Sequence, residues 1–429
     1  DTRPFANGPD TRPLSNGPDT QTQRAGRQPA AARAYRVRAD VRISRETRDR
    51  FRSFVKGDPA AGVANASEGA ESLAQRAMSR LRGLFGQARE NTQRPADPAD
   101  GPHADLLVEI AAALPRGSTP TLYTDRHEAA IELPRARRAF AKGDEALTLV
   151  ASDVRAARPP RLEPVDEAVD QMIGSLINNP DALLWVAQMR EENQQAGQQG
   201  VRVALYLILL GRQLGLPRPM LSTLGTIGML ADVGKVRLPR ALLDKPGMLN
   251  PAEYSIVKEH VRLGLEALSC SAALTPEVER GIAQHHERMD GSGYPKGLRG
   301  NEIGLYGRMA GIADSFAALS APRAYANPLA PQDALMSLYQ WADSSFHGSL
   351  VEQFVQAIGV FPVGSMVELS GGEVAVVVAH NRVRRLEPRV LLLTAPDKRP
   401  LPFPLEIDLM KPPRQPASSP SSAPSTVEM

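Results

Sequence analysis

Residues His285–Gly300 read HHERMDGSGYPKGLRG, a stretch that places two adjacent histidines, acidic residues and a glycine-rich turn with a tyrosine within sixteen residues. Gly291 and Gly293 permit a sharp exit from a preceding helix, because glycine adopts backbone conformations that other residues avoid. Tyr294 can then line the mouth of a pocket, with Pro295 fixing the backbone beside it. A plain turn would not need two histidines before it, so the stretch indicates a functional site.

A helix with a third histidine precedes this stretch. Asn250, followed by Pro251 and Glu253, forms a capping box with proline at the first helical position. The pattern predicts a helix from Pro251 to about Leu268, and His260 lies on it.

The histidine pair itself is expected near the end of the next helix. Thr275-Pro276 begins that helix, which we expect to end at Asp290-Gly291, and Pro331 begins another. Neighbouring helix residues point about 100° apart, so two adjacent imidazoles reach one metal only in a crowded or polynuclear site.

Two aspartates stand in apolar surroundings. Asp232 follows the run LGTIGML, and Asp314 lies inside MAGIADSF. A buried carboxylate is costly unless it is paired or metal-bound. Each aspartate alone is better explained as a cap or an ion-pair partner, whereas both together with the three histidines favour a metal site. Carboxylate and imidazole ligands without thiolate suit iron or manganese.

Composition restricts the kind of protein. The 429 residues hold one cysteine, Cys270, which excludes a disulfide framework and a thiolate zinc site. The net charge of +3 argues against nucleic acid as a partner. In residues 1–60, thirteen Arg or Lys against seven Asp or Glu give +6, which favours a solvated arm over a contact with lipid or nucleic acid. The longest uncharged apolar run, Val203–Gly211, is far shorter than the roughly 20 residues that cross a bilayer. We expect a cytoplasmic protein without a membrane span.

The fold is expected to be mainly α-helical. Helical periodicity dominates from Pro164 to about Gly359, and beyond Pro362 the hydrophobic period drops to two. There a hairpin with its turn at Ser370–Gly372 is predicted, followed by one further strand after Pro388.

These patterns divide the chain into five parts. The first is a nine-residue repeat with too little apolar area to fold, and the last is a Pro/Ser-rich tail. The predicted parts are a disordered arm (1–34), a linker region with minor secondary structure (35–160), a helical domain (161–360), a β-appendage (361–411) and a disordered tail (412–429).

These motifs resemble the HD-GYP signature, which marks a family of bacterial cyclic di-GMP phosphodiesterases within the HD superfamily. The similarity runs from Val165 to Lys411. It includes VRVALYLILLGRQLGL (201–216), GKVRLPRALLDKPGMLNPAEY (234–254), RMAGIADSFAAL (308–319) and FPVGSMVELSGGEVAVVV (361–378). The resemblance implies a helical domain with a two- or three-metal site that cleaves cyclic di-GMP to the linear dinucleotide or to GMP.

The resemblance also implies roles for individual residues. The metal ligands it retains are Asp232, His260, His285, His286 and Asp314. The catalytic residues are Asp232, which bridges metals in the family, and Lys235, which matches a lysine that helps to hold the substrate phosphate. The implied substrate-binding residues are Gly293, Tyr294, Pro295 and Arg323.

Several positions depart from the family pattern. Ala231 replaces the histidine of the name-giving His-Asp pair, and Gln195 and Gln199 replace a glutamate and a histidine. Ala317 and Ala326 replace an aspartate and a basic residue. Asp232 and the three histidines can still make one four-ligand site, with Asp314 as a fifth ligand or beside it.

Two functions follow from this pattern. One is a metal-dependent phosphodiesterase for cyclic di-GMP whose activity is reduced or lost. Its metal would be iron or manganese, bound as one ion rather than two or three. The alternative is an inactive module that binds cyclic di-GMP or a protein such as a GGDEF-type cyclase. The small apolar residues at ligand positions favour weakened catalysis, and the five retained ligands argue against a purely structural relic.

Overall fold

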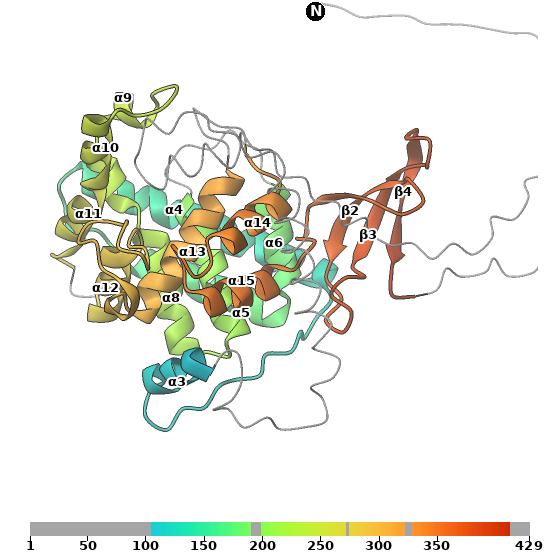
Figure 1. Cartoon of the computed structure of the whole chain (residues 1–429), viewed down its shortest axis with the longest axis horizontal. Coiled ribbons are helices and arrows are strands. Elements are labelled where there is room, and N and C mark those ends of the chain that lie inside the picture. The colour runs from blue at the N-terminus through green and yellow to red at the C-terminus, as the bar shows by residue number, and fades with distance from the viewer. Residues whose placement is uncertain (1–103, 190–198, 272–273, 322–327, 412–429) are drawn as a thin grey trace, which may run out of the picture. The chain divides into compact units, whose positions relative to one another are not determined.

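The computed structural model describes residues 104–189, 199–271, 274–321 and 328–411. Over these residues the fold is mainly α-helical with a small C-terminal antiparallel sheet, as predicted (Figure 1). The predicted disordered arm and tail, and the linker up to residue 103, lie outside the described residues. No helix in the described part of the chain is long and apolar enough to cross a membrane.

The α-helices, in chain order, are α3 (Ala104–Ala113), α4 (Ala129–Arg155), α5 (Glu163–Asn178), α6 (Pro180–Met189), α7 (Gln199–Gln213), α8 (Arg218–Leu230), α9 (Arg240–Leu243), α10 (Pro251–Lys258), α11 (His260–Leu268), α12 (Pro276–Gln284), α13 (Leu305–Ser320), α14 (Pro331–Gln340) and α15 (Gly348–Ile358). Two short 3-10 helices are η2 (Val233–Arg237) and η3 (Gly300–Glu302).

Helix α7 lies in the core of the helical bundle. Its sequence, QGVRVALYLILLGRQ, is apolar nearly all round, and such a helix needs neighbours on every side. It packs against α8, α13 and α15, and Tyr206 meets the rings of Phe316 and Phe354 edge-on at centroid distances of 4.9 and 6.3 Å. The same core therefore holds α8, which leads into Asp232, and α13, which carries Asp314.

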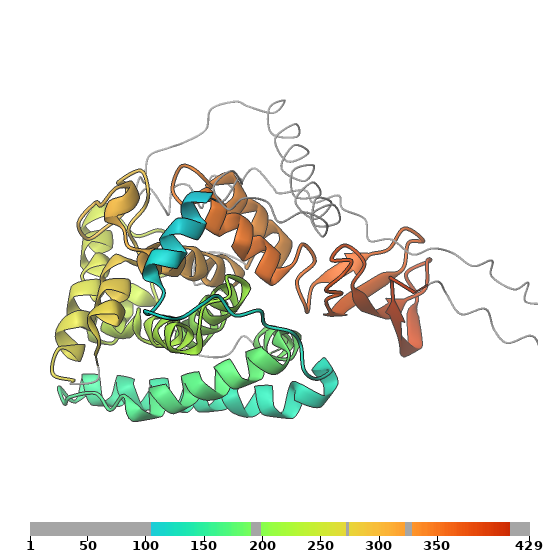
Figure 2. The same cartoon turned by 90° about the horizontal axis from the view of Figure 1, so that it is seen from below.

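Helix α4 extends the helical core upstream of the predicted boundary at residue 161. The expected linker with minor secondary structure is contradicted here, because α4 is a 27-residue helix packed against α5 and α6 (teal beside green in Figure 2). Its buried face includes Ala136, Ala139 and Ala146. Small side chains let helices pack closely but give a weak apolar signal in the sequence, which explains the error.

The helix predictions around the histidines hold in part. The capping box is formed, with the Asn250 side chain accepting from the Glu253 N–H at 2.8 Å and the Glu253 carboxylate accepting from the Asn250 N–H at 2.8 Å. The helix predicted to reach Leu268 is divided at Glu259 into α10 and α11.

The helix predicted to reach Asp290-Gly291 ends earlier, at Gln284, so this prediction was wrong. The Glu287 N–H donates to the Gln284 carbonyl at 2.9 Å, which closes a tighter turn than that of an α-helix. Nδ1 of His285 lies at hydrogen-bond distance, 2.6 Å, from the Ile282 carbonyl oxygen. These two contacts replace the next helical hydrogen bonds. The histidine pair consequently follows the helix instead of lying on it.

The C-terminal sheet has the strand order β1-β2-β3-β4, with all neighbours antiparallel. Its strands are β1 (Met366–Glu368), β2 (Val374–Ala379), β3 (Arg389–Thr394) and β4 (Pro400–Asp408). The predicted hairpin is present, with Val367 opposite Ala375. Strand β4, PLPFPLEID, was not predicted because three prolines argue against a strand. Proline is tolerated there because β4 lies at the edge of the sheet.

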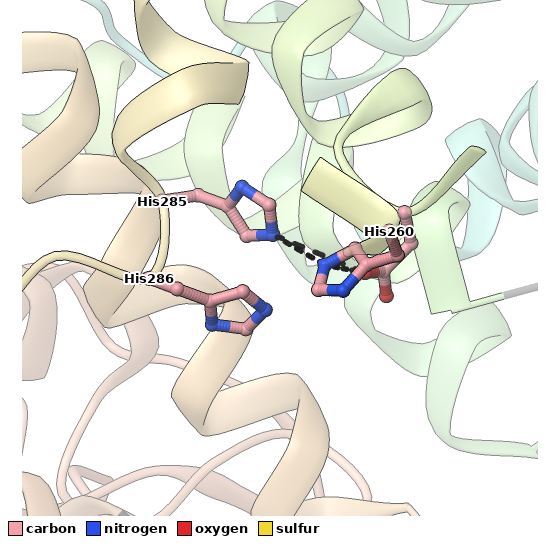
Figure 3. Close-up of side chains that lie close together, drawn as sticks. His260, His285 and His286 are labelled. Atoms are coloured by element: carbon pink, nitrogen blue, oxygen red, sulfur yellow. Dashed lines mark hydrogen bonds and ion pairs between the residues drawn. The ribbon is translucent and has the colours of Figure 1, made fainter. Parts of the chain in front are cut away.

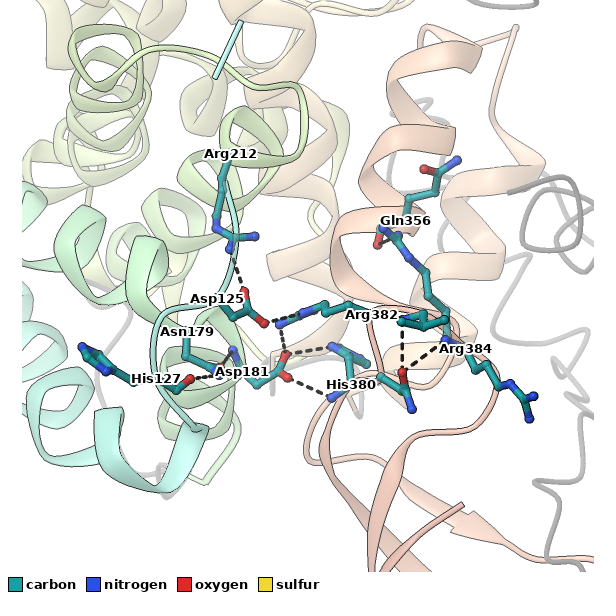
Figure 4. A network of polar contacts seen from close by, with 12 residues as sticks. Asp125, His127, Asn179, Asp181, Arg212, Gln356, His380, Arg382 and Arg384 are labelled. Carbon is teal, nitrogen blue, oxygen red and sulfur yellow. Dashed lines mark hydrogen bonds and ion pairs between the residues drawn. The ribbon is translucent and has the colours of Figure 1, made fainter. Parts of the chain in front are cut away.

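A buried polar network joins the sheet to the helices (Figure 4). Asp181 on α6 accepts from the backbone N–H of His380 at 2.8 Å and from its ring Nδ1 at 2.9 Å. The Arg382 guanidinium reaches Asp181 at 3.1 Å and Asp125 at 2.7 Å, and Asp125 also accepts from Arg212 at 2.7 Å. This network fixes the segment after β2 against α6.

Candidate metal centre

Four predicted ligands meet at one place in the helical bundle. One ligand atom from each of Asp232, His260, His285 and His286 lies within 4.8 Å of the other three. They come from three separate elements: the end of α8, the start of α11, and the turn after α12. Figure 3 shows the rings of His260 and His285 facing one another, with His286 beside them.

The ring orientations of His260 and His285 are set by backbone carbonyls. Nδ1 of His260 lies 2.7 Å from the Val257 carbonyl oxygen, and Nδ1 of His285 lies 2.6 Å from that of Ile282. A carbonyl oxygen only accepts, so each Nδ1 carries a proton, and in the neutral imidazole the lone pair then lies on Nε2. This is the arrangement that a metal-binding histidine adopts.

The free lone pairs converge on one point. The two Nε2 atoms are 3.5 Å apart, and Oδ1 of Asp232 lies 3.4 Å from one and 3.9 Å from the other. Oδ1 is buried and has no hydrogen-bond donor among the described residues. With both imidazoles neutral, these three electron-rich atoms repel one another, and a cation between them removes the repulsion. The residues present therefore fit a divalent metal ion.

The protonation states suit metal binding. Burial, followed by the charge of Lys235, lowers the pKa of His260 to about 3. Burial and the neighbouring His285 also lower the pKa of His286 well below its usual value. Burial alone would raise the pKa of Asp232, but Lys235 and the two nearby histidines outweigh it and hold that pKa below its usual value. At neutral pH His260 and His286 are neutral and Asp232 is ionised, as metal ligands must be.

A close backbone crossing brings Lys235 to the centre. A Cβ at Gly234 would lie 1.9 Å from the carbonyl oxygen of His260, so only glycine lets η2 cross α11 this closely. Lys235 then donates to Oδ2 of Asp232 at 2.7 Å. Asp232 therefore turns one oxygen toward the lysine and the other toward the histidines.

Asp314 lies beside the four-residue cluster. Its Oδ2 is 3.8 Å from Nδ1 of His286, and its Oδ1 accepts from the Gln199 side-chain amide at 3.1 Å. Gln199 is the residue predicted to replace a family histidine. Ala231 and Ala317, at two other substituted positions, are buried. Gln195, Arg323 and Ala326 lie outside the described residues.

The glycine-rich turn packs on the third histidine. Tyr294 stacks on His286 with a centroid distance of 4.6 Å and an angle of 28° between the rings, and its N–H donates to the His286 carbonyl at 3.2 Å. Gly293 is needed here, because a Cβ would lie 2.5 Å from Cα of Glu287. Pro295 is exposed. Burial, followed by the Tyr254 and Asp314 charges, raises the pKa of Tyr294 well above 10, so its hydroxyl stays protonated.

Sequence reasoning missed two residues inside its own motif, Glu287 and Arg288. The buried Glu287 carboxylate accepts the backbone N–H groups of Lys296 at 2.7 Å and Leu298 at 2.9 Å, which closes the turn. Arg288 is also buried. Their only signal in the sequence was their position directly after the two histidines, because charged residues are ordinary at an exposed turn and their type did not indicate burial.

Tyr254 and Lys258 were missed as well, because they belong to the preceding helix. The Lys258 ammonium lies 4.6 Å from the ring centroid of Tyr254 and 5.3 Å from that of Tyr294. Only the packing of α10 against the turn brings these three side chains together.

Comparison with known proteins finds a domain match over the part of the chain that holds this site. Residues 186–350 match the family model described as HD domain. Cyclic di-GMP phosphodiesterase PA4108 of Pseudomonas aeruginosa is 32% identical over 237 residues, which are 55% of this chain and 57% of that protein. The 3'3'-cGAMP-specific phosphodiesterase 2 of Vibrio cholerae is 37% identical over 165 residues, which are 38% of this chain and 32% of that protein. Cyclic di-GMP phosphodiesterase response regulator RpfG of Xanthomonas campestris is 41% identical over 132 residues, which are 30% of this chain and 35% of that protein.

The helical fold and the buried His/Asp cluster lie where residues 186–350 match an HD domain. The HD-GYP resemblance of the sequence motifs agrees with the names of two of these relatives, which are cyclic di-GMP phosphodiesterases. The chain spans about half the length of the first of these relatives and about a third of the other two.

Proposed function

We propose that this protein binds cyclic di-GMP at a single divalent ion and hydrolyses it slowly. The observation that carries the proposal is the convergence of three ligand atoms, Oδ1 of Asp232 and Nε2 of His260 and His285, where Oδ1 has no donor among the described residues. His286 supplies the fourth ligand. Iron or manganese suits these nitrogen and oxygen ligands.

A bound ion would polarise a phosphodiester and lower the pKa of a water molecule. Side chains of this protein would bind and orient the nucleotide. Lys235, whose side chain is 28% exposed, would turn from Asp232 toward a phosphate oxygen and neutralise it. Tyr294, held by Gly293 and Pro295, would border the nucleotide, and Arg323 would hold a phosphate.

The contact between Gln199 and Asp314 supports one ion instead of two. An amide N–H donor already satisfies Oδ1 of Asp314, where a second cation would otherwise neutralise the carboxylate. A pair of ions stabilises both the attacking and the leaving oxygen in phosphodiester hydrolysis. With one ion, turnover is expected to fall by about 100-fold or more.

The same contact favours a second candidate function, a module that binds cyclic di-GMP without hydrolysing it. In that case the bound nucleotide would change the affinity for a protein partner, for which GGDEF-type cyclases are candidates. The two functions share one binding site and differ only in turnover.

The test is to incubate the purified chain anaerobically with Fe(II) or Mn(II) and cyclic di-GMP, and to separate the products by chromatography. A parallel reaction with 3'3'-cGAMP compares the two nucleotides. Slow product formation that a chelator abolishes, and that Asp232→Asn lacks, would support the hydrolase. Nucleotide binding without product would support the binding module. If neither nucleotide binds, both functions are wrong.

A further inference from the structure

Arg288 is a buried cation next to the metal centre that the functional assignment leaves unexplained. It is 7% exposed, and although the charge of Asp314 acts on it, its guanidinium forms no ion pair with a carboxylate among the described residues. Its Nε is buried and has no hydrogen-bond partner in the part of the chain that the structure describes. Burying an incompletely paired charge is costly, so folding stability alone does not favour arginine here.

The guanidinium of Arg288 connects two parts of the site. One nitrogen donates to the carbonyl oxygens of Glu287 at 2.8 Å and His285 at 3.3 Å. Another donates to the hydroxyl of Ser315 at 3.3 Å. Ser315 follows Asp314 on α13, so the contacts run from the backbone of the histidine pair to the neighbour of the acidic residue.

The surrounding packing keeps this connection rigid. The ring centroid of Phe346 lies 4.8 Å from the guanidinium carbon. Gly311 on α13 gives the space, since a Cβ there would lie 3.2 Å from the His285 carbonyl oxygen and 3.3 Å from an Arg288 nitrogen. A planar guanidinium presents several donors in fixed directions, which the single ammonium of lysine does not.

We propose that Arg288 is a positioning residue for the metal centre. By joining the His285 and Glu287 carbonyls to Ser315, it sets the separation between His286 and Asp314, which is 3.8 Å from Nδ1 to Oδ2. This inference rests on the proposed metal-binding function. It concerns how tightly and in what geometry the ion is held, and it does not depend on turnover.

The test uses the full chain and Co(II), whose visible absorption reports the geometry of its ligands. Arg288→Lys keeps the charge and loses the planar donors, and we expect it to bind Co(II) about 10–100-fold more weakly with an altered spectrum. Ser315→Ala should weaken binding less. The variant that combines both substitutions should bind Co(II) about as weakly as Arg288→Lys alone, because the two side chains act through one contact. Arg280→Met, at an exposed position on α12, is the matched control and should bind as the unaltered chain does.

The outcomes separate this inference from the proposed function. Circular dichroism establishes that each variant is folded, and Ser315→Ala serves if Arg288→Lys does not fold. Unchanged Co(II) affinity and spectrum in a folded Arg288→Lys, or in Ser315→Ala if it replaces that variant, would overturn the positioning role. If the unaltered chain binds Co(II) but no cyclic dinucleotide, the proposed function fails while the role of Arg288 is still measured. If the unaltered chain binds no Co(II), both are wrong.

Discussion

Gln199 donates a hydrogen bond to Asp314 in a place where the family resemblance implies a metal-binding histidine. An amide neutralises a carboxylate only partly, because it carries no charge, but it leaves no space for an ion in the same direction. Ala231, next to Asp232, removes a second imidazole. With Gln195 in place of a glutamate, these substitutions leave fewer candidate ligands than the resemblance implies.

Restoring both imidazoles should restore a second ion. In Ala231→His combined with Gln199→His, we expect metal content measured by mass spectrometry to rise from about one to about two ions per chain. Turnover of cyclic di-GMP should rise about 100-fold with it. Ala231→His alone is the control and should change metal content little. Unchanged metal content in the folded double variant would contradict the assignment of these two positions.

At the scale of elements, the site depends on how closely short helices cross. The backbone of η2 lies against α11 because Gly234 has no side chain, and this contact brings Asp232 and Lys235 to His260. The turn after α12 folds back in a similar way at Gly293, which brings Tyr294 to His286. Each crossing fixes a ligand through backbone contacts, which are less adaptable than side-chain contacts.

Gly234→Ala should separate η2 from α11. A Cβ 1.9 Å from a backbone oxygen forces the two elements apart, and we expect a loss of about 3 kcal/mol in the free energy of unfolding. Metal affinity should fall as well, because Asp232 moves with η2. Urea denaturation and Co(II) titration measure the two effects.

Gly304→Ala is the control, since the nearest atom to its Cβ would be the end of the Gln284 side chain at 3.3 Å. That side chain can move, so the control should lose much less stability. Equal stability losses in the two variants would contradict the importance of this crossing.

At the scale of the molecule, a network of charges fastens the C-terminal sheet to the helices. Asp181 is 2% exposed, and burial alone would raise its pKa. The charges of Arg382 and His380 outweigh the burial and hold the pKa of Asp181 well below its usual value. A carboxyl whose pKa is lower in the folded state than in the unfolded chain stabilises the fold while it is ionised.

The stability gained from Asp181 should depend on pH. It is fully present above the unfolded pKa of about 3.9 and is lost as the pH falls through the lower pKa of the folded state. The free energy of unfolding of Asp181→Asn should therefore be about 3 kcal/mol lower than that of the unaltered chain at pH 7, because the substitution leaves Arg382 without its buried partner. The difference from the unaltered chain should shrink below about pH 4.

Urea denaturation at several pH values checks this prediction. Asp170→Asn is the matched control, because Asp170 is an exposed partner of Arg218 and its loss should matter little at any pH. A difference between Asp181→Asn and the unaltered chain that stays constant down to pH 2 would contradict the role assigned to the ionised carboxyl.

The sequence by itself was enough to predict the mainly helical fold, the C-terminal hairpin and the four candidate ligands whose side chains the structure brings together. These features are local. The capping box at Asn250, the nearly uniform apolar character of α7, and the charged or imidazole groups in apolar runs each show in a short segment. Burial costs restrict where such polar residues are tolerated, so their positions alone indicated a site.

Only the tertiary structure decided how those residues meet. The contribution of α4 to the core, the edge strand β4 and the end of α12 at Gln284 depend on neighbours that are distant in sequence. The same holds for the facing Nε2 atoms of His260 and His285, and for the amide of Gln199 on Asp314. Ring direction and hydrogen-bond partner are set by packing between helices, and a local sequence pattern carries no information about the surface it will pack against.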